Sequence, residues 1–128
     1  MGIRIFRAGT PRHRNDGLRL GTVCFLPRGV MKQDYARLNY FDVWLPVLAP
    51  SRELVRWAQS RKQWDARTRK TFYARYAREM KSNTDARQVI QFVAALSRRT
   101  DVSVGCYCAD ETRCHRPMLL KLIRSAMP

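Results

Sequence analysis

Thirteen residues, Gly-Cys-Tyr-Cys-Ala-Asp-Glu-Thr-Arg-Cys-His-Arg-Pro at positions 105–117, decide how this chain is interpreted. They contain three of its four cysteines and one of its two histidines. The apolar run 102–104 leads into them, and an apolar helix pattern over 118–123 follows. A strand, a reactive loop and a helix start, in this order, are typical of a site in an open α/β protein.

The size and composition of the chain indicate one globular domain over residues 1–128. Hydrophobic residues make up 45% of the sequence, and a chain of this length can bury a proper core. No apolar run approaches the roughly 18–20 residues needed to cross a bilayer, and the N-terminus lacks the apolar stretch of a signal peptide. We therefore expect a cytoplasmic protein without a membrane partner, in which clustered cysteines serve catalysis or metal binding rather than disulfides.

The charge of the chain is strongly positive. Lys and Arg number 25 against ten acidic residues, which gives a net charge of +15, and most of the cations are Arg. Arg favours planar, bidentate contact with phosphate or carboxylate, so we expect an anionic small molecule or nucleic acid as partner. A solvated basic surface is the alternative interpretation. The sequence leaves open whether the chain is a monomer or a homodimer.

Periodic patterns predict strands separated by helices. We expect an α/β fold, a single compact Rossmann-like three-layer domain with a small parallel or mixed sheet. Ser51 is the expected N-cap of the first helix, and Thr84 or Asp85 that of the third. The segment 40–45 fits a short strand or a helical turn equally well. The predicted strands cover residues 3–6, 18–26 and 102–108, and the predicted helices cover about 52–61, 64–80, 85–97 and 117–127.

The residues before Pro117 carry the expected chemistry. Pro117 suits the first helical position, and the backbone N–H groups of a helix start attract anions and lower the pKa of a nearby thiol. We therefore expect Cys114 to be the most acidic thiol and the reactive group, assisted by His115. The candidate catalytic residues are Cys114, His115, Asp110 and Glu111, the last two as possible general acids or bases.

Arginines on two segments form an expected anion subsite. Pro27 ends the second predicted strand, and Gly29 permits a positive φ, so the turn holds Arg28 at a strand end, where α/β sheets bind ligands. The candidate ligand-binding residues are Arg28, Gly29, Arg113 and Arg116.

Four interpretations of the cysteine cluster stay open. The first is a catalytic or ligand-binding thiol site without a cofactor, and the second is a redox pair of neighbouring thiols. In the third, the cysteines belong to the core and the loop only caps a helix. The fourth is a zinc site, although the spacing C-x-C-x5-C-H differs from the usual C-x2-C knuckle. Its ligands would be Cys106, Cys108, Cys114 and His115, of which the first two would share one face of a strand.

Aromatic residues alternate with Arg along the second predicted helix. Trp64, Phe72, Tyr76 and Met80 share one stripe, and basic residues cover much of the remainder. A core stripe with a basic outer face explains this pattern. A non-enzymatic DNA- or RNA-binding protein that uses Arg-rich helix faces is the alternative.

Motifs along nearly the whole chain resemble one known family. They are Ile-Arg-Ile-Phe-Arg at 3–7, Leu-Pro-Arg-Gly-Val at 26–30, Leu-Ala-Pro-Ser-Arg-Glu-Leu at 48–54 and Cys-His-Arg at 114–116. Together they resemble the YeaO-like branch of the domain of unknown function 488 (DUF488) family. The resemblance implies a compact Rossmann-like α/β fold and brings no established reaction.

The chain departs from that family pattern at the second strand. Val23 and Cys24 stand where the family usually has Val-Asp-Arg, and Leu26 replaces a Trp. An acid–arginine pair is therefore missing, and Cys24 is expected to approach Cys106 or Cys108. We expect a basic, thiol-containing pocket where the strands end near Phe25 and Cys108, for a nucleotide or the phosphate-bearing end of a nucleic acid.

Overall fold

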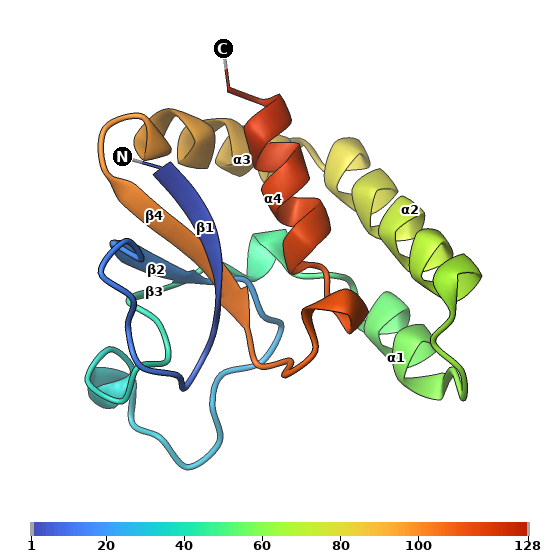
Figure 1. The fold of residues 1–128 in the computed structure, drawn as a ribbon, viewed down its shortest axis with the longest axis horizontal. Helices are drawn as coiled ribbons and strands as arrows, with labels where there is room; N and C mark the ends of the chain where they lie inside the picture. The colour runs from blue at the N-terminus through green and yellow to red at the C-terminus, as the bar shows by residue number, and fades with distance from the viewer. Residues whose placement is uncertain (1, 128) are drawn as a thin grey trace.

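The computed structural model describes residues 2–127, and four strands form its sheet (Figure 1). The order in the sheet is β1-β4-β2-β3, and all three strand pairs are parallel. The parallel α/β architecture predicted from the sequence is confirmed. The strands are β1 (Gly2–Arg7), β2 (Leu18–Gly21), β3 (Val43–Trp44) and β4 (Asp101–Cys106).

Four α-helices follow the predicted pattern closely. Ser51 caps the first, as expected, by accepting a hydrogen bond from the backbone N–H of Leu54. The cap of the third is Asn83 rather than Thr84 or Asp85, because the Asn83 side chain accepts from two free N–H groups of that helix. The helices are α1 (Arg52–Ser60), α2 (Ala66–Ser82), α3 (Thr84–Ser97) and α4 (Arg116–Ser125), and the 3-10 turns are η1 (Lys32–Asp34), η2 (Pro46–Leu48) and η3 (Glu111–Arg113).

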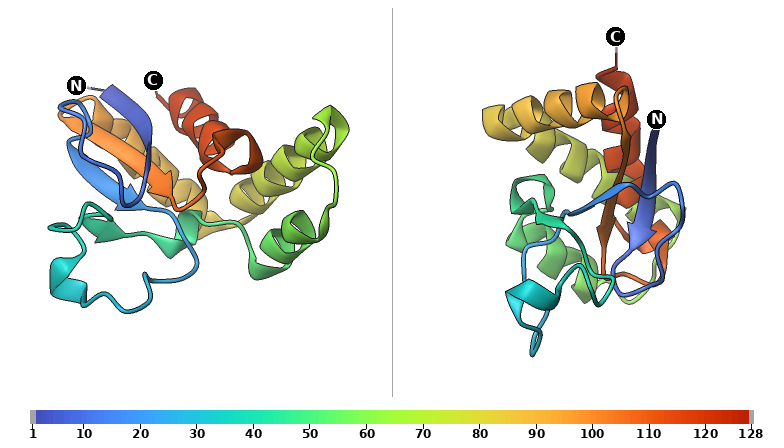
Figure 2. Two further views of the ribbon diagram at one scale, coloured as in Figure 1. Left: turned by 60° about the horizontal axis from the view of Figure 1, so that its bottom comes forward. Right: turned by 90° about the vertical axis from the view of Figure 1, so that its left-hand side faces the viewer.

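Three layers build the domain. One face of the sheet presents Leu20, Val102 and Val104 to the helices, in a core that includes the predicted α2 stripe. The other face is covered by loops, where Phe6 and Phe41 centre a smaller cluster. Figure 2 shows the loop 22–42 (cyan) at the sheet side of the molecule and α1 and α2 at the opposite side. Among the described residues, no helix is both long and apolar enough to cross a membrane.

Two strands end earlier than the sequence pattern predicts. β2 stops at Gly21 instead of Leu26, and β4 stops at Cys106 instead of Cys108. Gly21 pairs with Gly105, and beyond this pair the N–H and the hydroxyl of Thr22 donate to the carbonyl of Gly105, at 3.0 and 3.1 Å. The pairing of β2 with β4 therefore ends here, and the residues that follow each strand can line a site at the carboxyl edge of the sheet.

Candidate functional site

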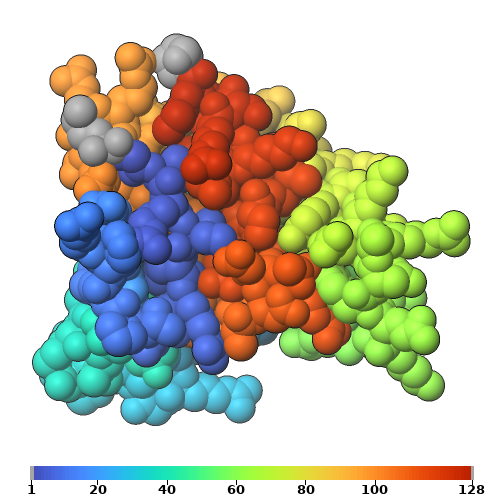
Figure 3. Space-filling model, in the orientation of Figure 1, coloured from blue at the N-terminus to red at the C-terminus, as the bar shows by residue number. Residues whose placement is uncertain are grey.

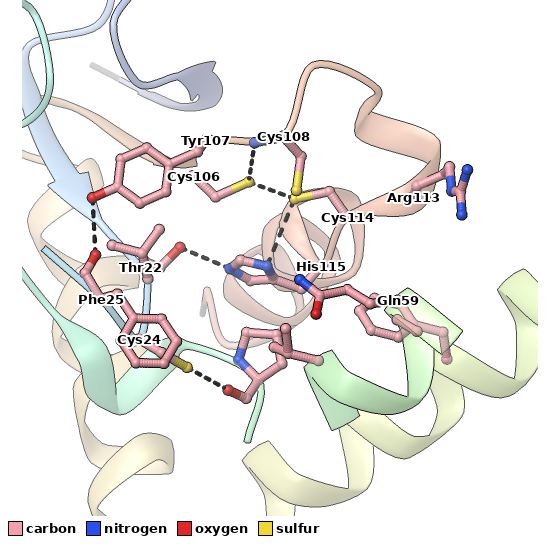
Figure 4. A pocket seen from close by; sticks show the side chains of 15 residues that line it. Thr22, Cys24, Phe25, Gln59, Cys106, Tyr107, Cys108, Arg113, Cys114 and His115 are labelled. Atoms are coloured by element: carbon pink, nitrogen blue, oxygen red, sulfur yellow. Dashed lines mark hydrogen bonds between the residues drawn. The ribbon is translucent and has the colours of Figure 1, made fainter. Parts of the chain in front are cut away.

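Three thiols meet where β4 runs into η3 and α4. The Sγ atoms of Cys106 and Cys114 lie 2.7 Å apart, and both residues are buried. The backbone N–H of Cys108 points to Cys106 Sγ at 3.4 Å, so the chain turns back toward the cluster just after the strand. Figure 4 shows the side chains of Cys106, Cys108 and Cys114 pointing toward one another.

His115 lies beneath the thiols, with a defined tautomer. Its Nε2 is 2.9 Å from Thr22 Oγ1, and that hydroxyl donates to the carbonyl of Gly105 at 3.1 Å. Thr22 Oγ1 therefore accepts a hydrogen bond from Nε2–H, which leaves the lone pair on Nδ1. Nδ1 lies 3.6 Å from Cys114 Sγ. Burial lowers the pKa of His115 to about 4, so the ring is neutral at pH 7 and its Nδ1 can accept a hydrogen bond from the Cys114 thiol.

Arg116 closes the cluster from behind. Only 3% of it is exposed, and its guanidinium donates to Cys114 Sγ (3.3 Å), to the carbonyl of Phe6 (2.7 Å) and to that of Cys108 (2.8 Å). These bonds tie the ends of β1 and β4 to the start of α4. The Arg116 charge stabilises a thiolate in the cluster, and most of its donors are already engaged by the protein itself.

The hydrogen bonds among the three thiols favour the ionisation of one of them and oppose that of the other two. Hydrogen bonds from Cys106 and then Cys114 lower the pKa of Cys108, and Arg116 supports the charge. The hydrogen bond to Cys108 raises the pKa of Cys106 strongly. For Cys114, the bond with Cys106 lowers the pKa, but the bond with Cys108 and burial outweigh it and raise the pKa to about 11. The expectation that Cys114 is the most acidic thiol is wrong, because Cys108 takes the charge at the more accessible position.

The cluster forms one wall of a pocket of about 310 Å³ (Figure 4). The volume is at the lower end of the range for small-ligand sites, roughly 300–1,000 Å³. The pocket that holds the thiols is mainly apolar rather than basic, with Arg113 as its cation. Its apolar and aromatic lining residues are Val23, Phe25, Pro50, Val55, Ala58, Phe72 and Tyr107.

The acidic candidates and the turn at Arg28 lie outside this pocket. Asp110 accepts hydrogen bonds from the N–H and hydroxyl of Thr112, and lines a hollow that shares Arg113 and Cys108 with the thiol pocket. Glu111 lines a different pocket, together with Arg116. Arg28 and Gly29 are exposed, and neither lines the thiol pocket, although Gly29 has the expected positive φ of 72°.

Two residues at the end of β2 take unexpected roles. Cys24 lines the pocket, but its thiol donates to the carbonyl of Pro50 at 3.0 Å, across the pocket from the other sulfurs (Figure 4). Thr22 was not singled out by the sequence pattern, because its partner His115 is 93 residues away. The sequence indicated Thr22 only indirectly, through the prediction that the strands 18–26 and 102–108 end at one pocket.

A metal ion could draw on three groups of this cluster. One ligand atom each from Cys106, Cys114 and His115 lies within 4.8 Å of the others. Two thiolates on one tetrahedral zinc stand about 3.7 Å apart, given Zn–S bonds of about 2.3 Å. The two sulfurs, at 2.7 Å, would have to separate by about 1 Å to share zinc.

Comparison with known protein families gives a match over most of the chain. The family model described as the active DUF488-N3 subclade matches residues 3–127, nearly the whole chain. No curated protein and no solved structure matches it. The matched range includes every residue of the thiol cluster.

Proposed function

The chain belongs to the DUF488 family, and we propose that it is a thiol-dependent enzyme acting on a small phosphorylated ligand, with a nucleotide as the best candidate. The observation that carries the proposal is the cluster of Cys108, Cys114 and His115 on the wall of a ligand-sized pocket. Its thiols would stay reduced in the cytoplasm, where we place the protein.

Each member of the cluster has a distinct role in the proposed chemistry. Cys108 supplies the candidate nucleophile, a thiolate favoured by its lowered pKa. Cys114 donates a hydrogen bond to Nδ1 of His115, the tautomer of which Thr22 fixes, and its contact with Cys108 helps to lower the pKa of that thiol. Arg116 supports the negative charge on the sulfurs. Asp110, in the adjoining hollow, is the carboxylate placed to accept a proton at the pocket rim, since the hydrogen bonds from Thr112 lower its pKa.

The lining of the pocket supports a ligand with a flat apolar part and an anionic end. Phe25, Phe72 and Tyr107 offer aromatic surface that suits a nucleobase. Arg113 stands at the rim and stacks over Trp64 at 5.1 Å, so its guanidinium is held where a phosphate would emerge.

Protection from alkylation tests the ligand class. Iodoacetamide would be added with and without each nucleoside 5′-monophosphate, and modification of Cys108 followed by mass spectrometry. A bound nucleotide is expected to slow alkylation at least fivefold in the wild type and less in Arg113→Ala. The matched control is Arg61→Ala, which changes an exposed arginine directly after α1 that does not line the pocket. Equal rates with and without every nucleotide would contradict a nucleotide ligand.

A zinc protein is the second candidate function, and the three convergent ligand atoms favour it. Cys108 would be the expected fourth ligand, as in the sequence-based hypothesis. Elemental analysis of protein purified without a chelator decides between the two. A zinc content near one ion per chain that is lost in Cys106→Ser and kept in Cys24→Ser would support a metal site and contradict the thiol enzyme.

Nucleic-acid binding is a third candidate, favoured by Trp57 on α1. Arg61 and Arg75 lie over its ring at 5.1 and 5.2 Å, and the outer face of α2 is rich in cations. A salt titration with a short oligonucleotide separates this function from the enzyme. Affinity that falls steeply with salt, is lost in Arg75→Ala and survives Cys108→Ser would favour the binding protein.

A further inference from the structure

A second pocket, of about 240 Å³, opens on the other side of Arg116. It lies at the carboxyl end of β1, between that strand, the loop 8–17 and the segment 109–116. Figure 3 shows β1 and the loop (blue) directly beside that segment (orange-red) on the front face. In contrast to the thiol pocket, its lining is mostly polar, and the proposed enzyme chemistry uses none of its surface beyond the buried Arg116.

The floor of this pocket is a buried ion cluster, in which Asp16 Oδ1 lacks a hydrogen-bond partner among residues 2–127 and forms an ion pair with Arg4 Nη1 at 3.2 Å. Arg19 is 1% exposed and donates to Asp16 and to the carbonyls of Thr10, Pro11 and Asn39. Because these bonds engage its guanidinium on every side, Arg19 has no donor left for a ligand. Its pairing with Asp16 at 2.9 Å also neutralises that carboxylate, which would otherwise repel an anion.

Three cationic or donor groups remain above this floor. Arg4 touches Asp16 through one Nη atom at 3.2 Å and is partly exposed. Arg7 is exposed and has no acidic partner among residues 2–127. His13 accepts the N–H of Asn15 at its Nδ1, so its other ring nitrogen carries the proton and can donate outward. Donors from β1 and from the loop therefore line one small cavity.

We propose that this pocket binds a phosphate group, with Arg7 and His13 as its principal ligands and Arg4 as support. Guanidinium groups match phosphate oxygens in bidentate geometry, and several donors around one small cavity suit a dianion. Glu111 also lines this pocket, and its negative charge opposes the binding of phosphate. Arg116 forms the partition between the two pockets, since it lines this one and bonds Cys114 Sγ in the other.

Phosphate titration by calorimetry tests the site, with inorganic phosphate as the probe. Wild type is expected to bind it saturably, in the millimolar range or tighter. Arg7→Ala and His13→Ala should each weaken binding about tenfold, the usual effect of losing one charge-assisted hydrogen bond. Glu111→Gln should tighten it severalfold. Arg14→Ala, an exposed arginine of the same loop outside the pocket lining, should leave binding within twofold of wild type.

Two results would overturn the site. One is the absence of saturable binding by wild type, and the other is an equal loss in Arg14→Ala and Arg7→Ala, which would reflect only the overall positive field. Cys108→Ser should retain phosphate binding, so failure of the thiol proposal leaves this one standing. Competition by a 5′-phosphorylated oligonucleotide, but not its 5′-hydroxyl form, would assign the phosphate to a nucleic-acid end; equal competition by a phosphomonoester would assign it to a small molecule.

Discussion

The Nε2 atom of His115 lies 2.9 Å from Thr22 Oγ1, and this contact joins the end of β2 to the start of α4 across 93 positions of sequence. The Thr22 hydroxyl is itself anchored on the carbonyl of Gly105 in β4. The hydrogen bond of Thr22, the residue that directly follows β2, thus decides which nitrogen of the buried His115 carries the proton.

Removal of that hydroxyl should release the histidine tautomer. Thr22→Val keeps the side-chain shape but leaves Nε2–H without its acceptor, which costs about 1–3 kcal/mol for a buried donor. We expect nitrogen NMR to show a single neutral tautomer protonated at Nε2 in wild type and a mixture in Thr22→Val. Thr22→Ser, which keeps the hydroxyl, should look like wild type. An unchanged spectrum of Thr22→Val would show that Thr22 does not set the tautomer.

Burial of His115 should make the protein less stable in acid. Its pKa falls from an ordinary 6.5 to about 4 in the folded protein because the charged ring loses its water. The unfolded chain therefore binds more protons in this window. The stability that comes from a neutral His115 is complete above pH 6.5 and is lost as the pH falls through 4, up to about 3 kcal/mol.

Urea unfolding of metal-free protein at several pH values measures this effect. Wild type should lose more free energy of unfolding between pH 6.5 and pH 4 than His115→Gln, which has no titrating ring. His13→Gln, which removes the exposed histidine, is the matched control and should follow wild type. Parallel curves for wild type and His115→Gln would contradict the buried neutral ring.

The three hydrogen bonds of Arg116 should make it important for stability. Arg116→Lys keeps the charge but cannot reach Phe6, Cys108 and Cys114 at once. We expect a loss of about 2–4 kcal/mol in the free energy of unfolding. Arg113→Lys, at the exposed rim, should change it by less than about 0.5 kcal/mol. Equal effects of the two substitutions would mean that Arg116 does not hold the strand ends.

Close backbone approach beneath the site should make Gly105 intolerant of a side chain. A Cβ atom there would stand 2.5 Å from the carbonyl oxygen of Phe6, which is backbone and cannot swing away. Gly105→Ala should lower the free energy of unfolding by about 1–3 kcal/mol or more. Gly2→Ala, with nothing within 4 Å of its added Cβ, is the control and should be near neutral. A neutral Gly105→Ala would show that β1 and β4 can separate freely here.

Local patterns in the sequence predicted most of the fold. Ser51 capped its helix as expected, and the four-residue period placed Phe72 and Tyr76 in the core. The ends of β2 and β4 were mispredicted, because apolar residues such as Phe25 continue the strand pattern after their pairing partners have ended. Strand length here depends on the neighbouring strand, which propensity alone does not contain.

The candidate site was predicted in position but not in its electrostatics. The motif indicated a thiol site with Cys114 and His115, and the structure brings both to one pocket. The helix-start argument assigned the lowest thiol pKa to Cys114, whereas burial and the bond with Cys108 raise it. Such coupling depends on the distances between the thiols. Cys108 and Cys114 follow Cys106 by two and eight residues, and this spacing in the sequence does not give the distances between their sulfurs.

Site-resolved alkylation of the four cysteines tests the central claim most directly. Wild-type protein would be treated with iodoacetamide between pH 5 and 9, and the rate at each cysteine followed by mass spectrometry. We predict that Cys108 reacts first and is already reactive below pH 7, while Cys24, the pKa of which is raised by burial, serves as the internal slow reference. Reaction of Cys108 no faster than Cys24, or only above pH 8, would contradict a thiolate at the heart of this site.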